Sequence, residues 1–257
     1  MKTWTEVPAG TLNAATQRFW VALGNNAETV ANQINTKPGF VDKLARFAEE
    51  HCVSEPLNWD RAREIMGKNF FGVEEAVKHF GINPKGKLAG LCDIPWSEEV
   101  LESVKDTHIL VAVFPLSILA MRAKRRRFFY LNSNYNKKLA FVRDKGQVGW
   151  HLVCKTPVGN STDKNWDEQQ ELLADSSMTP TAQVLVYTAV GCFMATRERL
   201  FTELAVRTSS PGLHSDYHIH IEGICMDAGY MIEITDDSVW DESRFPTVAL
   251  AAELKKP

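Results

Sequence analysis

Apolar residues recur at helical spacing through the first 80 residues of the chain. They fall at Leu12, Ala15, Phe19 and Leu23, again at Phe40, Leu44 and Phe47, and a third time at Val73, Ala76, Val77 and Phe80. A spacing of three to four residues is typical of amphipathic helices. Gly81 stands where helices commonly end, and a turn-forming run follows at residues 83–87. We therefore predict a helical region over residues 1–85.

Beyond residue 85 the pattern favours strands alternating with helices. Four segments are rich in β-branched and apolar residues, as strands are: 108–114, 128–131, 139–143 and 148–154. A short helix is expected to begin after Ser97, because Glu98 and Glu99 suit the first turn of a helix. A second helix is expected at residues 166–173.

A longer helix is predicted to begin at Thr179 and Pro180. Threonine is a good N-cap and proline is common at the first helical position. Apolar residues continue at helical spacing from Ala182 to Leu200, so the helix should end near Phe201. The β-branched residues within 184–190 leave a strand as the alternative.

The last part of the chain has the pattern of a β-hairpin. Segments 217–225 and 230–235 alternate in polarity and flank the turn signal Asp227-Ala228-Gly229. On the first strand, Tyr217, Ile219 and Ile221 should be more buried than His218, His220 and Glu222. The prediction for the fold is α+β, with the helical N-terminal region followed by a mixed sheet domain over residues 86–257 that includes this hairpin.

Charge is distributed unevenly along the chain. Residues 122–145 contain nine basic residues and one acidic residue, whereas the whole chain carries a net charge of −3. The candidate site residues here are Arg122, Lys124, Arg125, Arg126, Arg127 and Tyr130. Clustered bases can neutralise phosphates and neighbouring rings can stack on nucleobases, which makes nucleic acid or another polyanion the expected partner. The same bases could instead form a solvated surface.

An acidic segment near the end of the chain offers an internal partner for these bases. It contains Glu233, Asp236, Asp237, Asp241 and Glu242. If it pairs with the basic residues, both clusters are structural. Otherwise its carboxylates form a solvated loop or take part in chemistry.

A second kind of site is suggested by the sequence His218-Ile219-His220-Ile221-Glu222. Side chains alternate along a strand, so His218, His220 and Glu222 share one face and could bind zinc or iron. The simpler interpretation is the solvent face of an amphipathic strand. We therefore expect that the three residues do not share a metal, and a metal-dependent enzyme is kept as the alternative function.

Other chemistry has little support. The five cysteines are scattered and include no C-x-x-C pair, so reduced thiols in a cytoplasmic protein are expected. The longest apolar run, residues 109–121, is too short to span a membrane, and no signal peptide is visible. Nucleotide and hydrolase motifs are missing, so no cofactor is expected.

A helix-turn-helix over residues 73–91 is a further alternative, weakened by Gly86 and Gly90.

Several short segments resemble a family of uncharacterised bacterial proteins. They are Gly149-Trp150-His151-Leu152-Val153, Lys155-Thr156-Pro157-Val158, Trp166-Asp167-Glu168-Gln169, Thr181-Ala182, Glu198-Arg199-Leu200-Phe201 and Val206-Arg207-Thr208-Ser209-Ser210. The resemblance covers roughly residues 107–240. It implies a bacterial origin and a self-contained C-terminal unit, but no activity and no catalytic residues.

The leading interpretation is a non-catalytic cytoplasmic binding protein whose bases at residues 122–145 meet nucleic acid or phosphate-bearing ligands. The first alternative is the metal-dependent enzyme that uses His218, His220 and Glu222. The second is an accessory protein whose charged patches contact other proteins.

Overall fold

The computed structural model describes residues 27–43, 58–129, 140–212, 217–226, 229–236 and 248–257. The chain divides into two compact units, residues 1–55 and 56–257. In the first unit, helix α2 spans Ala27–Thr36. The apolar stripe predicted at residues 12–23 lies outside the described residues, as does most of the stripe at residues 40–47.

The second unit begins with helices whose ends follow local rules. Helix α4 (Trp59–Met66) starts after Asn58, whose side chain accepts a hydrogen bond from the backbone N–H of Arg61. Helix α5 (Val73–Phe80) ends at Gly81, which is left-handed with φ 62°. Helix α6 (Glu98–Val104) starts after Ser97. The helices predicted at residues 73–80 and after Ser97 are confirmed.

The first sheet has the strand order β1-β2-β3-β9-β4. Its strands are β1 (Phe70–Phe71), β2 (His108–Val113), β3 (Gly149–Cys154), β9 (Glu253–Leu254) and β4 (Ser177–Met178). The strands predicted at residues 108–114 and 148–154 are confirmed as the antiparallel pair β2 and β3. Because β1 pairs with β2 and α4 packs on α6, the expected boundary after residue 85 falls inside this unit.

The second sheet has the strand order β7-β6-β5-β8. Its strands are β5 (Val206–Pro211), β6 (His218–Met226), β7 (Gly229–Asp236) and β8 (Ala249–Leu250). The predicted hairpin is confirmed, because β6 and β7 pair antiparallel from Ile219 opposite Asp236 to Met226 opposite Gly229. The chain passes from β8 in this sheet to β9 in the other. The α+β class is therefore correct.

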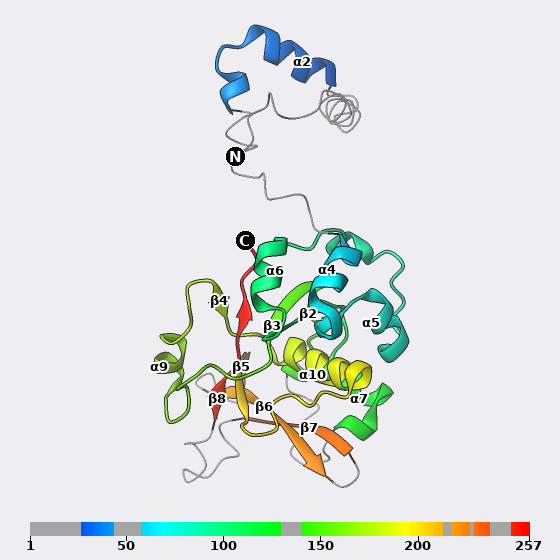
Figure 1. Cartoon of the computed structure of the whole chain (residues 1–257), viewed down its shortest axis with the longest axis vertical. Coiled ribbons are helices and arrows are strands. Elements are labelled where there is room, and N and C mark those ends of the chain that lie inside the picture. Colours follow the sequence, from blue (N-terminus) through cyan, green and yellow to red (C-terminus); the bar gives the residue numbers. More distant parts are fainter. Residues whose placement is uncertain (1–26, 44–57, 130–139, 213–216, 227–228, 237–247) are drawn as a thin grey trace. The chain divides into compact units, whose positions relative to one another are not determined.

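Helix α10 (Ala182–Thr196) forms the centre of the core between the two sheets (Figure 1). Every residue from 182 to 193 is buried, and α10 contacts β2 and β3 on one side and β5, β6 and β7 on the other. Burial on all sides explains why the β-branched residues are helical, since tertiary packing outweighs local preference. The strand alternative is wrong. The helix is capped by Thr181 rather than Thr179 and ends at Thr196, short of Phe201.

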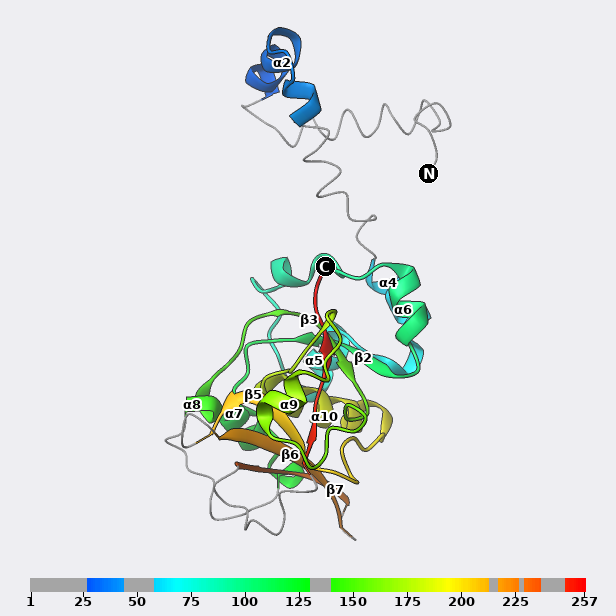
Figure 2. The same ribbon diagram turned by 90° about the vertical axis from the view of Figure 1, so that its left-hand side faces the viewer.

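One of the two strand predictions around the basic residues is wrong, and the other lies partly outside the described residues. In the segment 128–131, Phe128 ends a 3-10 helix, Arg126–Phe128, that follows helix α7 (Ile118–Lys124), and Phe129 forms an isolated β-bridge with Ile232 of β7. Both rings are buried. In place of a strand at residues 139–143 the structure has helix α8 (Ala140–Arg143), which packs beside α7 (Figure 2). Residues 130–139 are outside the described part.

The remaining helix predictions have mixed outcomes. Helix α9 (Trp166–Gln170) confirms the helix expected at residues 166–173 in a shorter form. The alternative helix-turn-helix at residues 73–91 is wrong, because α5 is followed by a turn around left-handed Gly86 and then a short 3-10 helix, Leu88–Leu91.

Within the described residues, none of the helices is long and apolar enough to cross a membrane.

Burial on the hairpin differs from the prediction at two positions. Ile219 and Ile221 are buried, as expected, but His220 is equally buried at 1% exposure, and Tyr217 is only half-buried. The physical reason is that both faces of this strand are covered. Helix α10 lies on the isoleucine side, and Arg207 of β5 is buried beside His220.

Candidate functional site

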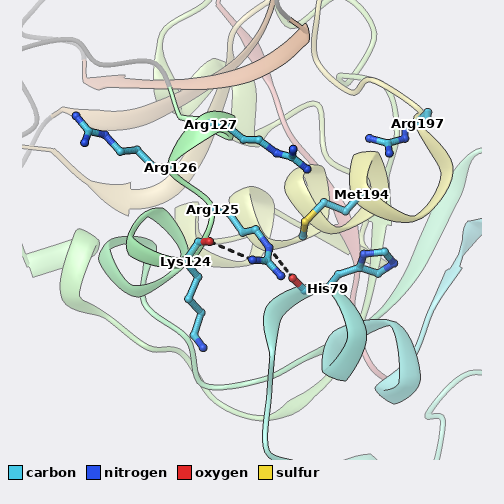
Figure 3. Close-up of a pocket in the computed structure, with 7 residues that line it drawn as sticks. All are labelled: His79, Lys124, Arg125, Arg126, Arg127, Met194 and Arg197. Atoms are coloured by element: carbon cyan, nitrogen blue, oxygen red, sulfur yellow. Dashed lines mark hydrogen bonds between the residues drawn. The ribbon is translucent and has the colours of Figure 1, made fainter.

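A pocket of about 600 Å³ lies where the C-terminal ends of three helices meet (Figure 3). It is lined by His79 of α5, by Lys124, Arg125, Arg126 and Arg127 at and after the end of α7, and by Met194 and Arg197 at the end of α10. We call these seven residues the basic pocket. Helix C-termini carry partial negative charge, so basic side chains are stabilised there.

Arg125 links two of these helix ends. Its Nε donates a hydrogen bond to the His79 carbonyl oxygen at 2.8 Å, and its Nη1 donates to the Lys124 carbonyl oxygen at 3.1 Å. The side chain therefore satisfies acceptors that a helix end leaves open. Both partners are uncharged carbonyls at helix C-termini, so they offset the positive charge of Arg125 only in part.

Arg127 and Arg197 are held on a pair of packed aromatic rings. Phe128 and Phe193 pack edge to face with their centroids 5.7 Å apart. The Arg127 guanidinium lies 4.7 Å from the centroid of Phe128, and that of Arg197 lies 5.6 Å from the centroid of Phe193. Cation–π contacts of this kind restrict both guanidiniums. Figure 3 shows both side chains on the Met194 side of the pocket, with Arg126 extended away from them.

Acidic partners are missing from the described part of this site. Among the lining residues that the structure describes there are five cationic side chains and no carboxylate. Lys124, Arg126, Arg127 and Arg197 are all exposed, and none forms an ion pair with another described residue. Close cations without acids repel one another, so an anion bound among them would be stabilised.

The structure brings together only part of the predicted site. Lys124, Arg125, Arg126 and Arg127 line the pocket, but Arg122 does not, and Tyr130 lies outside the described residues. Phe128 and Phe129 are buried in the core, so their rings are not available for stacking on nucleobases. Sequence reasoning missed His79, Met194 and Arg197, because isolated residues on α5 and α10 carry no local signal of a shared site.

His79 is the titratable group of the pocket. Burial, the largest effect, and the charges of Lys78, Arg125 and Arg197 lower its pKa, while Glu75 opposes them. Below the ordinary histidine pKa of about 6.5 the unfolded chain binds this proton more readily than the folded protein does, so acidification lowers the stability.

We expect the pKa of His79 to lie below its ordinary value in the free protein and to rise when sulfate is added. An anion in the pocket stabilises the imidazolium, whereas the surrounding cations disfavour it. The pH titration of the His79 ring signals by NMR, with and without sulfate, measures both. A pKa that sulfate leaves unchanged would contradict the placement of an anion beside this ring.

Arg197 has an unfavourable backbone conformation. It is the C-cap of α10 and has φ 67°, in the left-handed region where glycine is the usual residue. A side chain at such a position costs about 1–2 kcal/mol. An observed outlier of this kind suggests that the side chain has a function.

Replacing Arg197 with glycine should leave the free energy of unfolding unchanged or raise it by up to about 1 kcal/mol. Relief of the left-handed conformation outweighs the flexibility that glycine adds to the unfolded chain. Urea denaturation of the two proteins measures the difference. Arg197→Ala is the matched control, since alanine keeps the strain; a glycine variant less stable than the alanine variant would contradict this account.

The predicted metal residues lie in a different, polar part of the fold. The ring of His218 stacks on Trp166 of α9 with centroids 3.6 Å apart. His220 Nε2 accepts a hydrogen bond from Arg207 Nε at 3.4 Å, and Arg207 Nη1 donates to Gln169 Oε1 at 2.8 Å. Within the described residues, no group of three potential ligands is arranged to hold a metal ion. The guanidinium beside His220 also disfavours a cation at that nitrogen.

The remaining predictions concern the acidic segment and the thiols. Glu233 lies on β7 opposite Glu222 of β6, whereas the rest of the acidic segment falls wholly or largely outside the described residues. Cys92, Cys154 and Cys192 are free thiols, as predicted. Cys52 and the side chain of Cys225 are outside the described part.

Comparison with known proteins adds no relative: no family model, curated protein or solved structure matches this chain. The resemblance to uncharacterised bacterial proteins and a bacterial origin stay predictions.

Proposed function

We propose that this protein is a cytoplasmic binding protein for phosphate-bearing ligands, which it holds in the basic pocket. The observation that carries the proposal is the presence of five cationic side chains, from the ends of α7 and α10, around a pocket whose described lining includes no carboxylate. Arginine donates several hydrogen bonds in a planar arrangement that matches phosphate oxygens.

For the binding of an anion, the charge of the basic pocket matters more than the net charge of the whole chain. The net charge of −3 would repel an anion at long range. Within a Debye length of about 8–10 Å, however, the pocket cations dominate the potential. Binding should therefore weaken with added salt.

The aromatic part of the nucleic-acid hypothesis receives less support than the basic part. Phe128 and Phe129 are buried in the core, and Phe128 lies under the Arg127 guanidinium, so neither ring is available to stack on a base. The proposal therefore relies on the contacts that the basic side chains would make with phosphate. The metal-dependent enzyme has no comparable support, since His218 stacks on Trp166 and His220 faces Arg207. No specific observation favours the protein-interaction alternative.

The test is calorimetric titration of the full chain at about 50 mM salt, where phosphate contacts are strong. The titrants are inorganic phosphate, inorganic pyrophosphate and a short DNA duplex. At least one should bind, and Arg197→Gly should weaken that binding by about tenfold or more, because it removes a charge-assisted hydrogen bond.

Arg199→Ala is the matched control, because Arg199 is exposed two residues after Arg197 and does not line the pocket. It should bind like the wild type. Absence of binding by all three titrants, or equal binding by Arg197→Gly and the wild type, would refute the proposed function.

A further inference from the structure

We propose that the ligand of the basic pocket carries two linked phosphoryl groups and that Arg127 and Arg197 together hold one of them. This inference rests on the proposed function and specifies its ligand class. It follows from the charge of the pocket, its size, and the way the two arginines are fixed.

The charge of the pocket exceeds what one phosphate group can neutralise. Lys124, Arg126, Arg127 and Arg197 make no ion pair with described residues, and Arg125 is bonded only to neutral carbonyls. A single phosphate group carries about −1.5 to −2 at pH 7. A second linked phosphoryl group adds negative charge without adding a second binding event, so its gain is not reduced by another loss of translational freedom.

The pocket is also larger than a single phosphate needs. Its volume of about 600 Å³ lies within the range of about 300–1,000 Å³ that is usual for small-molecule sites. The cationic groups are spread over this space. Arg127 and Arg197 lie on the Met194 side, whereas Lys124 Nζ lies beside Gly81, 3.6 Å from where a Cβ would stand at that glycine.

The pairing of Arg127 and Arg197 provides the specific contact. They come from segments 70 residues apart, but the packed rings of Phe128 and Phe193 fix their guanidiniums on one side of the same pocket. Donors that already rest on a ring lose less conformational freedom on binding than free side chains do. The left-handed conformation of Arg197 places an arginine where glycine would be the favoured residue.

The same rings argue for recognition of phosphoryl groups and not of a nucleobase. Phe128 and Phe193 are 4% and 9% exposed, and each is associated with a guanidinium. Neither ring is part of the described pocket lining, which contains no phenylalanine, tyrosine or tryptophan. A free diphosphate and a nucleoside diphosphate share the chemistry that this pocket recognises.

The experiment compares four ligands by calorimetry at about 50 mM salt: inorganic phosphate, inorganic pyrophosphate, AMP and ADP, with a short DNA duplex as competitor. Pyrophosphate and ADP should bind with similar affinity, each about tenfold or more tighter than phosphate and AMP. In Arg127→Ala and in Arg197→Ala this preference should shrink, whereas Arg199→Ala should retain it.

Each contrary result has its own meaning. Equal affinities for phosphate and pyrophosphate would overturn the two-phosphoryl inference and leave the proposed function intact. A duplex that binds more tightly than pyrophosphate would overturn it in favour of nucleic acid. If none of the ligands binds, the proposed function fails together with the inference. Tighter binding of both AMP and ADP than of pyrophosphate would show that the base is recognised and would also overturn it.

Discussion

Replacing both Arg127 and Arg197 with alanine should weaken the binding of inorganic pyrophosphate by about 10²–10⁴-fold. Each arginine donates hydrogen bonds to a charged acceptor, and such bonds contribute about 1.5–3 kcal/mol each. If each arginine supplies one such bond, the two losses sum to about 3–6 kcal/mol of binding free energy before any coupling between them, at about 1.4 kcal/mol for each factor of ten. Calorimetric titration at low salt measures the loss.

The two substitutions should not act independently if both side chains hold the same phosphoryl group. A double-mutant cycle should give a coupling free energy of about 0.5 kcal/mol or more. The control is again Arg199→Ala, which is near Arg197 in sequence but outside the pocket lining. The arginines do not share a ligand if the losses of binding free energy in the two single variants add up to the loss in the double variant. The same conclusion follows if the affinity of the double variant for pyrophosphate is within about threefold of the wild type.

Trp150→Ala should lower the free energy of unfolding by about 3–5 kcal/mol, the usual cost of deleting a large buried ring. Trp150 is 1% exposed on β3 and packs with Trp59 of α4 and Phe70 of β1 at centroid distances of 6.3 and 5.5 Å. Its Nε1 donates a hydrogen bond to the Leu91 carbonyl oxygen at 3.1 Å. The ring therefore joins the first sheet to the helices that cover it.

The conservative variant separates packing from hydrogen bonding. In Trp150→Phe most of the ring remains, and the Leu91 carbonyl still accepts from Trp59 Nε1 at 2.7 Å, so a loss of about 1 kcal/mol is expected. Urea denaturation followed by circular dichroism measures both variants. A decrease of less than about 1 kcal/mol in the free energy of unfolding of Trp150→Ala would show that removal of this ring leaves no costly cavity.

Local rules in the sequence predict the elements that depend on local structure. Gly81 ends α5, Ser97 caps α6, and the alternating residues of β6 and β7 form the hairpin. These features depend on backbone conformation and on side-chain alternation, both of which are visible in a single sequence.

The elements that depend on tertiary packing could not be predicted in the same way. Helix α10 contains β-branched residues that favour a strand locally, but burial on all sides makes it a helix. The local pattern predicts a strand that begins at Phe128, but Phe128 ends a 3-10 helix and Phe129 forms an isolated β-bridge with Ile232. The alternation of polar and apolar residues along β6 predicts that His220 is exposed, but Arg207 and neighbouring elements bury it.

The residues of the candidate site also divide into those that a single sequence reveals and those that only the fold brings together. The run of bases Lys124 to Arg127 is visible in the sequence, because these residues are adjacent. Arg197 and His79 join them only because α5, α7 and α10 end at the same place. Neither the structural role of Arg125 nor the left-handed conformation of Arg197 can be inferred from residue type.

Arg127 and Arg197 are expected to bind the same phosphate-bearing ligand in the basic pocket. The most direct measurement is an NMR titration of the arginine Nε–Hε signals with inorganic pyrophosphate at about 50 mM salt. The signals of Arg127 and Arg197 should shift together and saturate with the same dissociation constant, while the signal of Arg199 should stay in place. Unchanged Arg127 and Arg197 signals, or an equal shift at Arg199, would contradict this expectation.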